Sequence, residues 1–140
     1  MAEQVYSIEF AGYWPDWRKD LLPARSGIYC VYECTHNQRK NTIVARQLIY
    51  IGEADDVRSR VSNHEKYEDW KRRVRPGNDI FYSVAFVEGA EQARCEAALI
   101  FAHQPPENTA YRTAFPFDRT TIKLSGKTDL LNPAFTVNRT

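Results

Sequence analysis

The sequence contains few cysteines and no repeated or low-complexity segment, and these shortages exclude several classes of protein. There are three cysteines in 140 residues, an odd number without paired spacing, which argues against a disulfide framework and for a reducing compartment. Cys30, Cys34 and His36 form a C-x-x-x-C-x-H pattern, but the second ligand pair of a zinc site is missing. The absence of internal repeats argues against a solenoid or an array.

Long apolar runs are missing as well. No stretch approaches the roughly 20 residues that a membrane span requires. The N-terminus, M-A-E-Q-V-Y, lacks the basic region followed by an apolar one that marks a secretory signal. With 43% apolar residues the chain can still bury a modest core, and its length fits one domain over residues 1–140. We therefore expect a soluble cytoplasmic protein without a membrane partner.

The chain also lacks a large net charge, but the value of +1 hides a local asymmetry. Between Arg58 and Arg75 there are seven basic residues and three acidic ones. The run K-R-R-V-R at 71–75 fits either a solvated helix end or a surface that follows a nucleic-acid backbone.

The order of apolar and polar segments predicts an α/β (α+β) fold. We expect a central, mostly antiparallel three-stranded sheet flanked by helices. The expected strands cover 27–33, 46–52 and 79–87. One helix is expected after Gly52, capped by Asp55 or Asp56 and ended by R-P-G-N at 75–78, and another over 90–103. A short amphipathic helix is expected in Y-W-P-D-W-R-K-D-L-L-P, which ends at Pro23.

Two tyrosines stand beside glycines in the first two expected strands. The strings are Gly27-Ile28-Tyr29 and Tyr50-Ile51-Gly52. Because side chains alternate along a strand, pairing of these two strands can bring both phenols over one patch of the sheet.

Charged residues occupy core-facing positions of both expected helices. Val57, Arg60, Val61 and His64 stand at i, i+3, i+4 and i+7. Either the Arg60 guanidinium extends to water and His64 is structural, or the two side chains together bind a phosphate group. Glu96 shares a face with Ala93, Ala97 and Ile100. It is either a surface carboxylate or a group suited to one hard divalent ion such as magnesium.

These features together resemble the GIY-YIG nuclease family. The resemblance covers residues 27–108, the expected core being about 25–108, and it continues through E-A-A-L-I-F-A-H-Q-P-P-E-N as far as Asn108. The start of the first helix is similar to that of the nuclease module of bacterial excision-repair incision subunits. Glu53 is a departure, because those proteins commonly have lysine there.

The resemblance implies a metal-dependent endonuclease that hydrolyses DNA. Tyr29 would be the general base, Arg60 would bind the scissile phosphate, and Glu96 would hold one Mg²⁺ or Mn²⁺ ion. A nearby cation would lower the pKa of the Tyr29 phenol. Tyr50 would orient the water or phosphate, and His64 would hydrogen-bond Tyr29 or the phosphate. The other residues expected to contact or frame the substrate are Gly27, Gly52, Arg58, Lys71, Arg72, Arg73 and Asn108, and Asn108 is also a candidate structural tether.

Two other functions use the same scaffold. One is a nucleic-acid-binding module that does not cut, and the other is a protein-interaction module. A homodimer, or a protein partner that supplies specificity, is left open. The C-terminal extension, 109–140, lies outside the resemblance and could extend the sheet, cover it or make a subunit contact.

Overall fold

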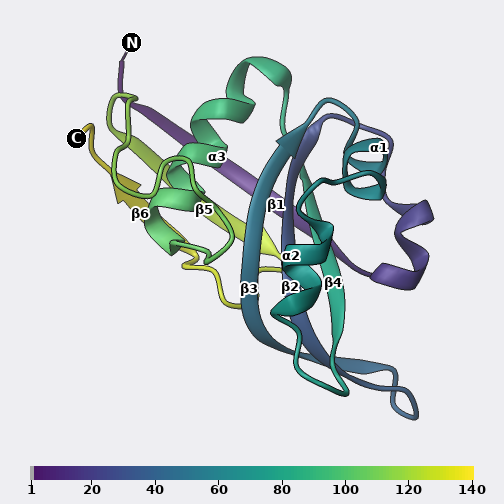
Figure 1. The fold of residues 1–140 in the computed structure, drawn as a ribbon. Coiled ribbons are helices and arrows are strands. Elements are labelled where there is room, and N and C mark those ends of the chain that lie inside the picture. The colour runs from purple at the N-terminus through teal and green to yellow at the C-terminus, as the bar shows by residue number, and fades with distance from the viewer. Residues whose placement is uncertain (1) are drawn as a thin grey trace.

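The computed structural model describes residues 2–140 and shows an α+β fold. Within this range the strands form one six-stranded mixed sheet in the order β3-β2-β4-β1-β5-β6 (Figure 1). The strands are β1 (Gln4–Pro15), β2 (Gly27–Asn37), β3 (Thr42–Ala54), β4 (Asp79–Phe86), β5 (Thr120–Gly126) and β6 (Ala134–Val137). The helices are the 3-10 helix η1 (Asp16–Leu21) and the α-helices α1 (Val57–Ser62), α2 (Tyr67–Arg72) and α3 (Gly89–His103).

The expectation of a three-stranded sheet is therefore wrong in its strand count. The three expected strands are β2, β3 and β4, and they pair antiparallel with β2 in the middle. The additional strands come from the two ends of the chain. The C-terminal extension adds β5 and β6, so it extends the sheet.

The strand β1 was not predicted, because its N-terminal half shows the alternation of a strand and its C-terminal half resembles the start of a helix. Ile8 and Phe10 are buried while Ser7 and Glu9, which alternate with them, are exposed, as expected for a half-buried strand. The aromatic residues and Pro15 that follow favoured a helix start, and only Asp16–Leu21 is helical, as a short 3-10 helix. β1 pairs antiparallel with β4 and parallel with β5, so it joins the two ends of the sheet.

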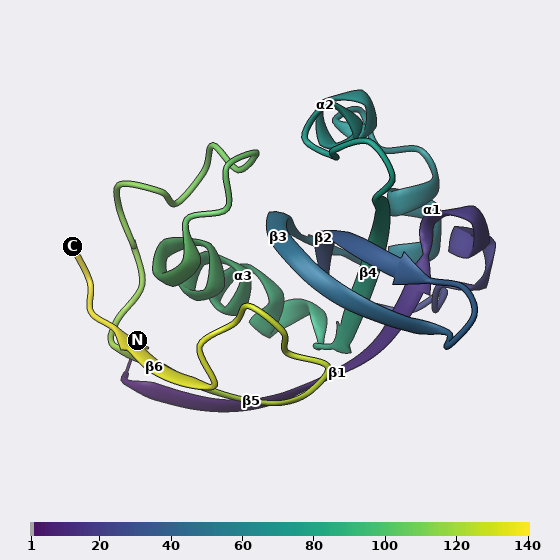
Figure 2. The same ribbon diagram turned by 90° about the horizontal axis from the view of Figure 1, so that it is seen from below.

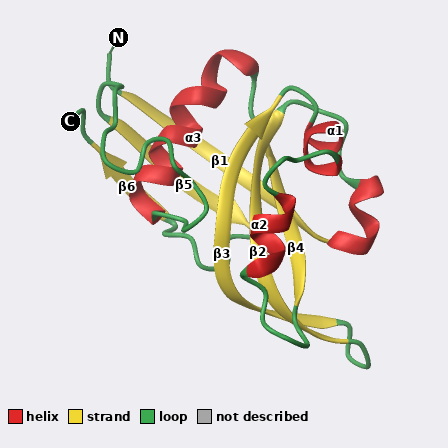
Figure 3. Ribbon diagram, in the orientation of Figure 1, coloured by secondary structure: helices red, strands yellow, loops and turns green. Residues whose placement is uncertain are grey.

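The strands β2 and β4 are buried on both faces, whereas β1, β5 and β6 bury only one. The sheet curls around α3, which packs with β1, β5 and the even-numbered residues of β2 (Figure 2). The helices α1 and α2 lie with η1 on the other side, over Val31, Tyr82 and Val84 (Figure 3). Trp70 of α2 is fully buried there. The edge strand β3 thus runs between α3 and the pair α1 and α2.

The expected long helix after Gly52 is two short helices with a turn at residues 63–66. Asp56 caps α1, because its side chain accepts a hydrogen bond from the Ser59 backbone N–H at 3.1 Å. The Asn63 side chain donates to the Ser59 carbonyl, and Asn63 leaves helical geometry. An asparagine that bonds to its own backbone in this way competes with helix continuation.

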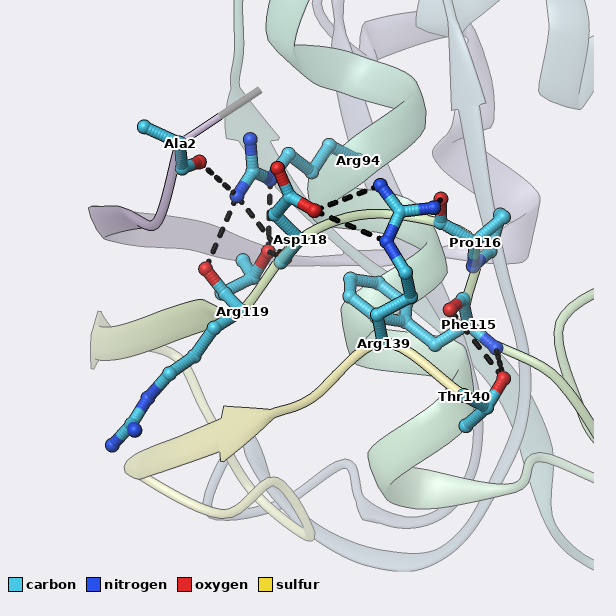
Figure 4. Close-up of polar contacts among 9 residues, drawn as sticks. Ala2, Arg94, Phe115, Pro116, Asp118, Arg119, Arg139 and Thr140 are labelled. Carbon is cyan, nitrogen blue, oxygen red and sulfur yellow. Dashed lines mark hydrogen bonds and ion pairs between the residues drawn. The ribbon is translucent and has the colours of Figure 1, made fainter.

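Arg94 of α3 fixes the N-terminal end of β1 against β5. Its guanidinium donates to the carbonyls of Ala2, Asp118 and Arg119 and to the Thr120 hydroxyl (Figure 4). Arg139 lies on the other side of the same segment and forms an ion pair with Asp118 at 2.8 Å. Arg94 thus ties the C-terminal extension to the rest of the sheet, whereas the Arg139 contacts lie within the extension.

None of the helices in residues 2–140 combines the length and hydrophobicity needed to cross a bilayer.

Glu33 of β2 is a buried carboxylate that is fully hydrogen-bonded. Its side chain is 0% exposed and accepts from the Arg75 guanidinium and backbone N–H, from Asn78 and from Gln47. Burial alone would raise its pKa, but the donors outweigh burial and lower the pKa of Glu33 to about 2. The network joins β2 to the turn that follows α2.

We expect Glu33→Gln to lower the free energy of unfolding at pH 7 by about 2–3 kcal/mol, because it replaces a fully paired buried charge. Since the pKa of Glu33 is lower in the folded state, its stabilisation is present above about pH 4.5 and is lost as pH falls towards 2. Urea unfolding between pH 7 and pH 2 should therefore show the wild type and the variant converging in acid. The exposed Glu68→Gln is the control. A difference that is independent of pH would contradict the ionised network.

Candidate active site

The register of β2 and β3 brings Tyr29 and Gly52 opposite each other. A Cβ atom added at Gly52 would overlap the Tyr29 ring and its hydroxyl oxygen, so glycine is required for the ring to lie there. Tyr29 is 1% exposed, and its ring centroid is 6.3 Å from that of Tyr50. The expected convergence of the two phenols is confirmed.

His64 packs against both tyrosines from the turn after α1. Its ring centroid is 6.2 Å from Tyr29, 5.3 Å from Tyr50 and 4.4 Å from Trp70. The Lys66 backbone N–H donates to Nδ1, and Nε2 has no hydrogen-bond partner among residues 2–140. The expected hydrogen bond from His64 to Tyr29 is therefore not formed. Burial, assisted by Arg60, lowers the pKa of His64 to about 4, so the ring is neutral near pH 7.

Arg60 of α1 is held by a carboxylate that the sequence analysis did not single out. Its Nη2 atom lies 2.7 Å from Glu65 Oε2, and the two side chains are 38% and 64% exposed. Arg60 is close enough to Tyr29 and Tyr50 for its charge to lower the pKa of both phenols. Arg60 thus occupies the solvent side of the tyrosine pair, with an exchangeable acidic partner.

Glu96 reaches the tyrosines from α3. One turn earlier on the same helix, Gln92 donates to the Ala54 carbonyl at 3.1 Å, and this contact fixes α3 against the end of β3. Burial and the nearby Glu53 carboxylate raise the pKa of Glu96 to about 7, although a hydrogen bond from the Glu53 backbone opposes the increase. The Glu96 charge in turn raises the pKa of both Tyr29 and Tyr50. The alternative of a freely solvated Glu96 is wrong.

The expectation that a cation lowers the pKa of Tyr29 is only partly met. Burial raises this pKa most, Tyr50, Glu96 and Glu65 also raise it, and Arg60 alone among the named groups lowers it. The net direction is upward. Burial likewise raises the pKa of Tyr50 to about 12. Without bound ligands both phenols are therefore protonated near neutral pH.

Asn108 and Gly27 shape the site without facing a substrate. The Asn108 amide accepts from the Ile51 backbone N–H and donates to the Ile51 carbonyl, and the residue is 5% exposed. These two bonds form the expected structural tether. A Cβ at Gly27 would overlap the Ala85 carbonyl, so Gly27 allows β2 and β4 to pack closely.

The predicted basic residues lie around α1 and α2, each with a local partner. Arg58 donates to the Leu22 carbonyl at 2.6 Å, Arg72 pairs with Asp69, and Arg73 pairs with Glu107. Lys71 lies 4.0 Å from Glu68 and stands over the Tyr67 ring. Exposed ion pairs of this kind exchange partners readily, because each contributes at most about 1 kcal/mol to the free energy of unfolding. A hollow of about 460 Å³ lies among them, lined by Gln47, Asp69, Arg72, Arg73, Arg75 and Glu107.

The C-terminal extension contributes one further residue to the site. Burial raises the pKa of Tyr111, and the charges of Glu96 and Glu53 raise it further. Its backbone is left-handed, with φ of 60°. Nothing in the local sequence pattern marks Tyr111, because its position depends on how residues 104–112 return to β3.

The site's oxygen donors suit a hard divalent ion such as Mg²⁺ or Mn²⁺ better than a softer ion such as Zn²⁺ or Cu²⁺. In the described part of the chain, no group of three or more His, Cys, Asp or Glu side chains gathers in a metal-binding arrangement. Glu96 and Glu53 provide carboxylate oxygens, and Oε2 of Glu53 is buried without a hydrogen-bond partner among residues 2–140. Mg²⁺ and Mn²⁺ accept few protein carboxylates and retain water.

Neither a family model nor a curated protein nor a solved structure matches this chain.

We expect Gly52→Ala to destabilise the protein by about 1–3 kcal/mol, because the added methyl group forces the Tyr29 ring from its place. Gly89→Ala is the matched control, since a Cβ there meets nothing within 4 Å and alanine favours the helix. Urea unfolding monitored by circular dichroism would measure both variants. Equal stability of Gly52→Ala and the wild type would contradict the described packing.

Proposed function

We propose that this protein is a metal-dependent endonuclease of the GIY-YIG type that hydrolyses phosphodiester bonds in DNA. The observation that carries the proposal is the gathering of Tyr29, Tyr50, Arg60 and Glu96, which come from four separate elements, around the contact between Tyr29 and Gly52. Each of these residues has a role in phosphodiester hydrolysis, and the reaction needs all of these roles in one place.

Arg60 is the group that binds the scissile phosphate. Its planar guanidinium can donate two parallel hydrogen bonds to phosphate oxygens, which lysine cannot reproduce. The exposed Glu65 carboxylate occupies Arg60 in the DNA-free protein, and an incoming phosphate takes its place. Arg72 and Arg73 along α2 would contact neighbouring phosphates by the same exchange of partners.

Tyr29 takes the proton from the attacking water. In the free protein burial keeps its hydroxyl protonated, so catalysis requires positive charge close to the phenol. Arg60 supplies part of this charge. His64 is neutral and buried, so it positions Tyr29 and Tyr50 by packing and does not act as an acid.

Glu96 would hold the single divalent ion. Such an ion supplies Lewis-acid stabilisation of the leaving 3′ oxygen when it is bound. Burial beside Glu53 makes the Glu96 carboxylate costly to ionise, so a cation gains from neutralising it. The charge of Glu96 raises the pKa of Tyr50, and the charge of Arg60 lowers it. Tyr50 orients the water or the phosphate.

We expect purified protein to nick supercoiled or branched DNA when Mg²⁺ or Mn²⁺ is present. Arg60→Ala and Glu96→Gln should each reduce the nicking rate by about 100-fold or more, because each removes a transition-state interaction. Gel assays of nicked and linear products would measure this. Arg119→Ala and Glu88→Gln are matched controls, since Arg119 is an exposed, ion-paired arginine at the far end of the sheet and Glu88 immediately precedes α3.

Failure to cut any of these substrates across pH 6–9 with either ion would contradict the proposal. Retained DNA binding without cutting would then indicate the non-cleaving module. Wild-type rates in either site variant would contradict the roles given to Arg60 and Glu96.

We expect Glu65→Gln to increase affinity for DNA by a few-fold, because the variant releases Arg60 from its carboxylate partner and removes a negative charge beside the phosphate. Fluorescence anisotropy with labelled DNA in EDTA would measure binding without cutting. Glu3→Gln, which removes an exposed carboxylate paired with Arg119 outside the site, is the control. Unchanged or weaker binding by Glu65→Gln would show that Glu65 does not compete with phosphate.

A further inference from the structure

The three tryptophans of the chain differ in how far their rings are exposed. Trp70 is fully buried, and Trp14 packs against the core that α1 and α2 cover. Trp17, in η1, is 54% exposed. The rings of His36 and Phe81 each contact it at a centroid distance of 5.6 Å, and these contacts hold it in place. The proposed catalytic roles do not use this accessible ring.

Trp17 lines a hollow of about 350 Å³ between η1, α2 and the turn that leads into β4. This volume falls within the range of about 300–1,000 Å³ that is usual for small-molecule sites. Tyr67 forms part of the wall, and its hydroxyl donates to Asp16, which also accepts from the Tyr82 hydroxyl at 2.7 Å. Lys19 pairs with the same carboxylate at 3.5 Å, so Asp16 is already satisfied within the protein.

Two exposed cations also line this hollow. Lys71 stands over the Tyr67 ring, and its ion pair with Glu68, at 4.0 Å, joins two exposed side chains that exchange partners at little cost. Arg75 binds the buried Glu33 carboxylate through Nε and Nη2, yet its own side chain is 65% exposed. Because a guanidinium has a third nitrogen, Arg75 can hold Glu33 and still donate to a phosphate.

The remaining carboxylate of the lining is Asp79, which is half-buried at the start of β4. A carboxylate repels phosphate, but it accepts hydrogen bonds from the amino group of a base such as cytosine. The hollow thus combines an aromatic face, a hydrogen-bond acceptor and two cations. These groups complement the flat face, the amino edge and the phosphates of a nucleotide.

Ring contacts join the hollow to the candidate active site. Tyr67 packs against Trp70 at a centroid distance of 6.3 Å, and Trp70 packs against Tyr50 at 5.3 Å and against His64 at 4.4 Å. The hollow is therefore two ring contacts away from Tyr50, on the other side of the buried Trp70.

We propose that this hollow binds an unpaired base of the DNA substrate, stacked on Trp17, while Lys71 and Arg75 contact the adjoining phosphates. The two faces of a base in a duplex are covered by its neighbours, so a side chain can stack fully only on an unpaired base. This inference rests on the proposed function for the identity of the nucleic acid, and it makes the substrate a DNA with a single-stranded segment beside the cleaved bond.

Binding of labelled single-stranded oligo(dC) of about 12 nucleotides, measured by fluorescence anisotropy in EDTA, tests the proposal without cutting. We expect oligo(dC) to bind more tightly than a duplex of the same length, and Trp17→Ala to weaken its binding by about fivefold or more. Trp17→Phe should retain most of the affinity, because phenylalanine also stacks on bases. Leu21→Ala is the matched control, since Leu21 is 51% exposed in the same helix, and its affinity should stay within about twofold.

Quenching of tryptophan fluorescence provides a second readout, which a purely structural Trp17 would not give. We expect bound oligo(dC) to quench the emission of the wild type and to leave that of Trp17→Phe unchanged, because Trp70 is buried and Trp14 packs against the core.

The salt dependence of binding tests the cations. Lys71→Gln should reduce the slope of log affinity against log salt concentration by about 0.7, as the loss of one phosphate contact to a single strand requires. Lys123→Gln, an exposed lysine on β5, is the control and should leave the slope unchanged.

The proposal is overturned if oligo(dC) binds no more tightly than the duplex, if Trp17→Ala binds it as tightly as the wild type, or if Leu21→Ala weakens binding equally. Tighter binding of oligo(rC) than of oligo(dC) would contradict DNA as the ligand. These outcomes do not depend on cleavage. Stacking of oligo(dC) on Trp17 in a protein that cuts no DNA would support this site and contradict the nuclease. Cutting by a protein whose DNA affinity ignores Trp17 would do the reverse.

Discussion

The contact between Tyr29 and Gly52 is the constraint on which the site depends. Because β2 and β3 pair in a register that places these residues opposite each other, the phenol ring lies across the edge strand where a side chain would otherwise stand. Tyr50 packs beside the Tyr29 ring, His64 packs against Tyr50, and Trp70 packs against His64. Asn108 holds the edge strand β3 in place. Its amide bonds to the backbone N–H and carbonyl of Ile51, which no further strand pairs with. Strand pairing therefore sets the position of every aromatic group in the site.

Charges surround this aromatic core in two places of unlike character. Arg60 and Glu65 form an exposed pair that exchanges partners at little cost. Glu96 is partly buried near the like charge of Glu53, and both effects raise its pKa to about 7. Under the proposed function, Arg60 exchanges its acidic partner for a phosphate and Glu96 accepts the divalent ion. A phosphate with its counter-ion presents both complementary groups at once, which is why the two places are best explained together.

Much of this arrangement could be predicted from residues alone. Asp56 caps α1 as expected, and the strands β2, β3 and β4 lie where their patterns indicated. For Glu96 the pattern left two alternatives open, and the structure shows a partly buried side chain. The rest depends on contacts between distant segments. β1 pairs in parallel with residues 120–126, a pairing that leaves no local pattern, and Glu65 and Tyr111 enter the site through a turn and a returning loop.

The central position of β1 has a consequence for how the chain is made. Its first strand lies between β4 and β5, and the partner on one side, β5, begins only at Thr120. While the ribosome extends the chain, the β2 and β3 hairpin can close as soon as it emerges, but one edge of β1 stays unpaired until the C-terminal residues are synthesised. An unpaired edge is where nascent chains associate wrongly. The strands β5 and β6 therefore protect β1, and the Arg94 bonds that tie Ala2 to Asp118 and Arg119 form only after residues 118 and 119 have been synthesised.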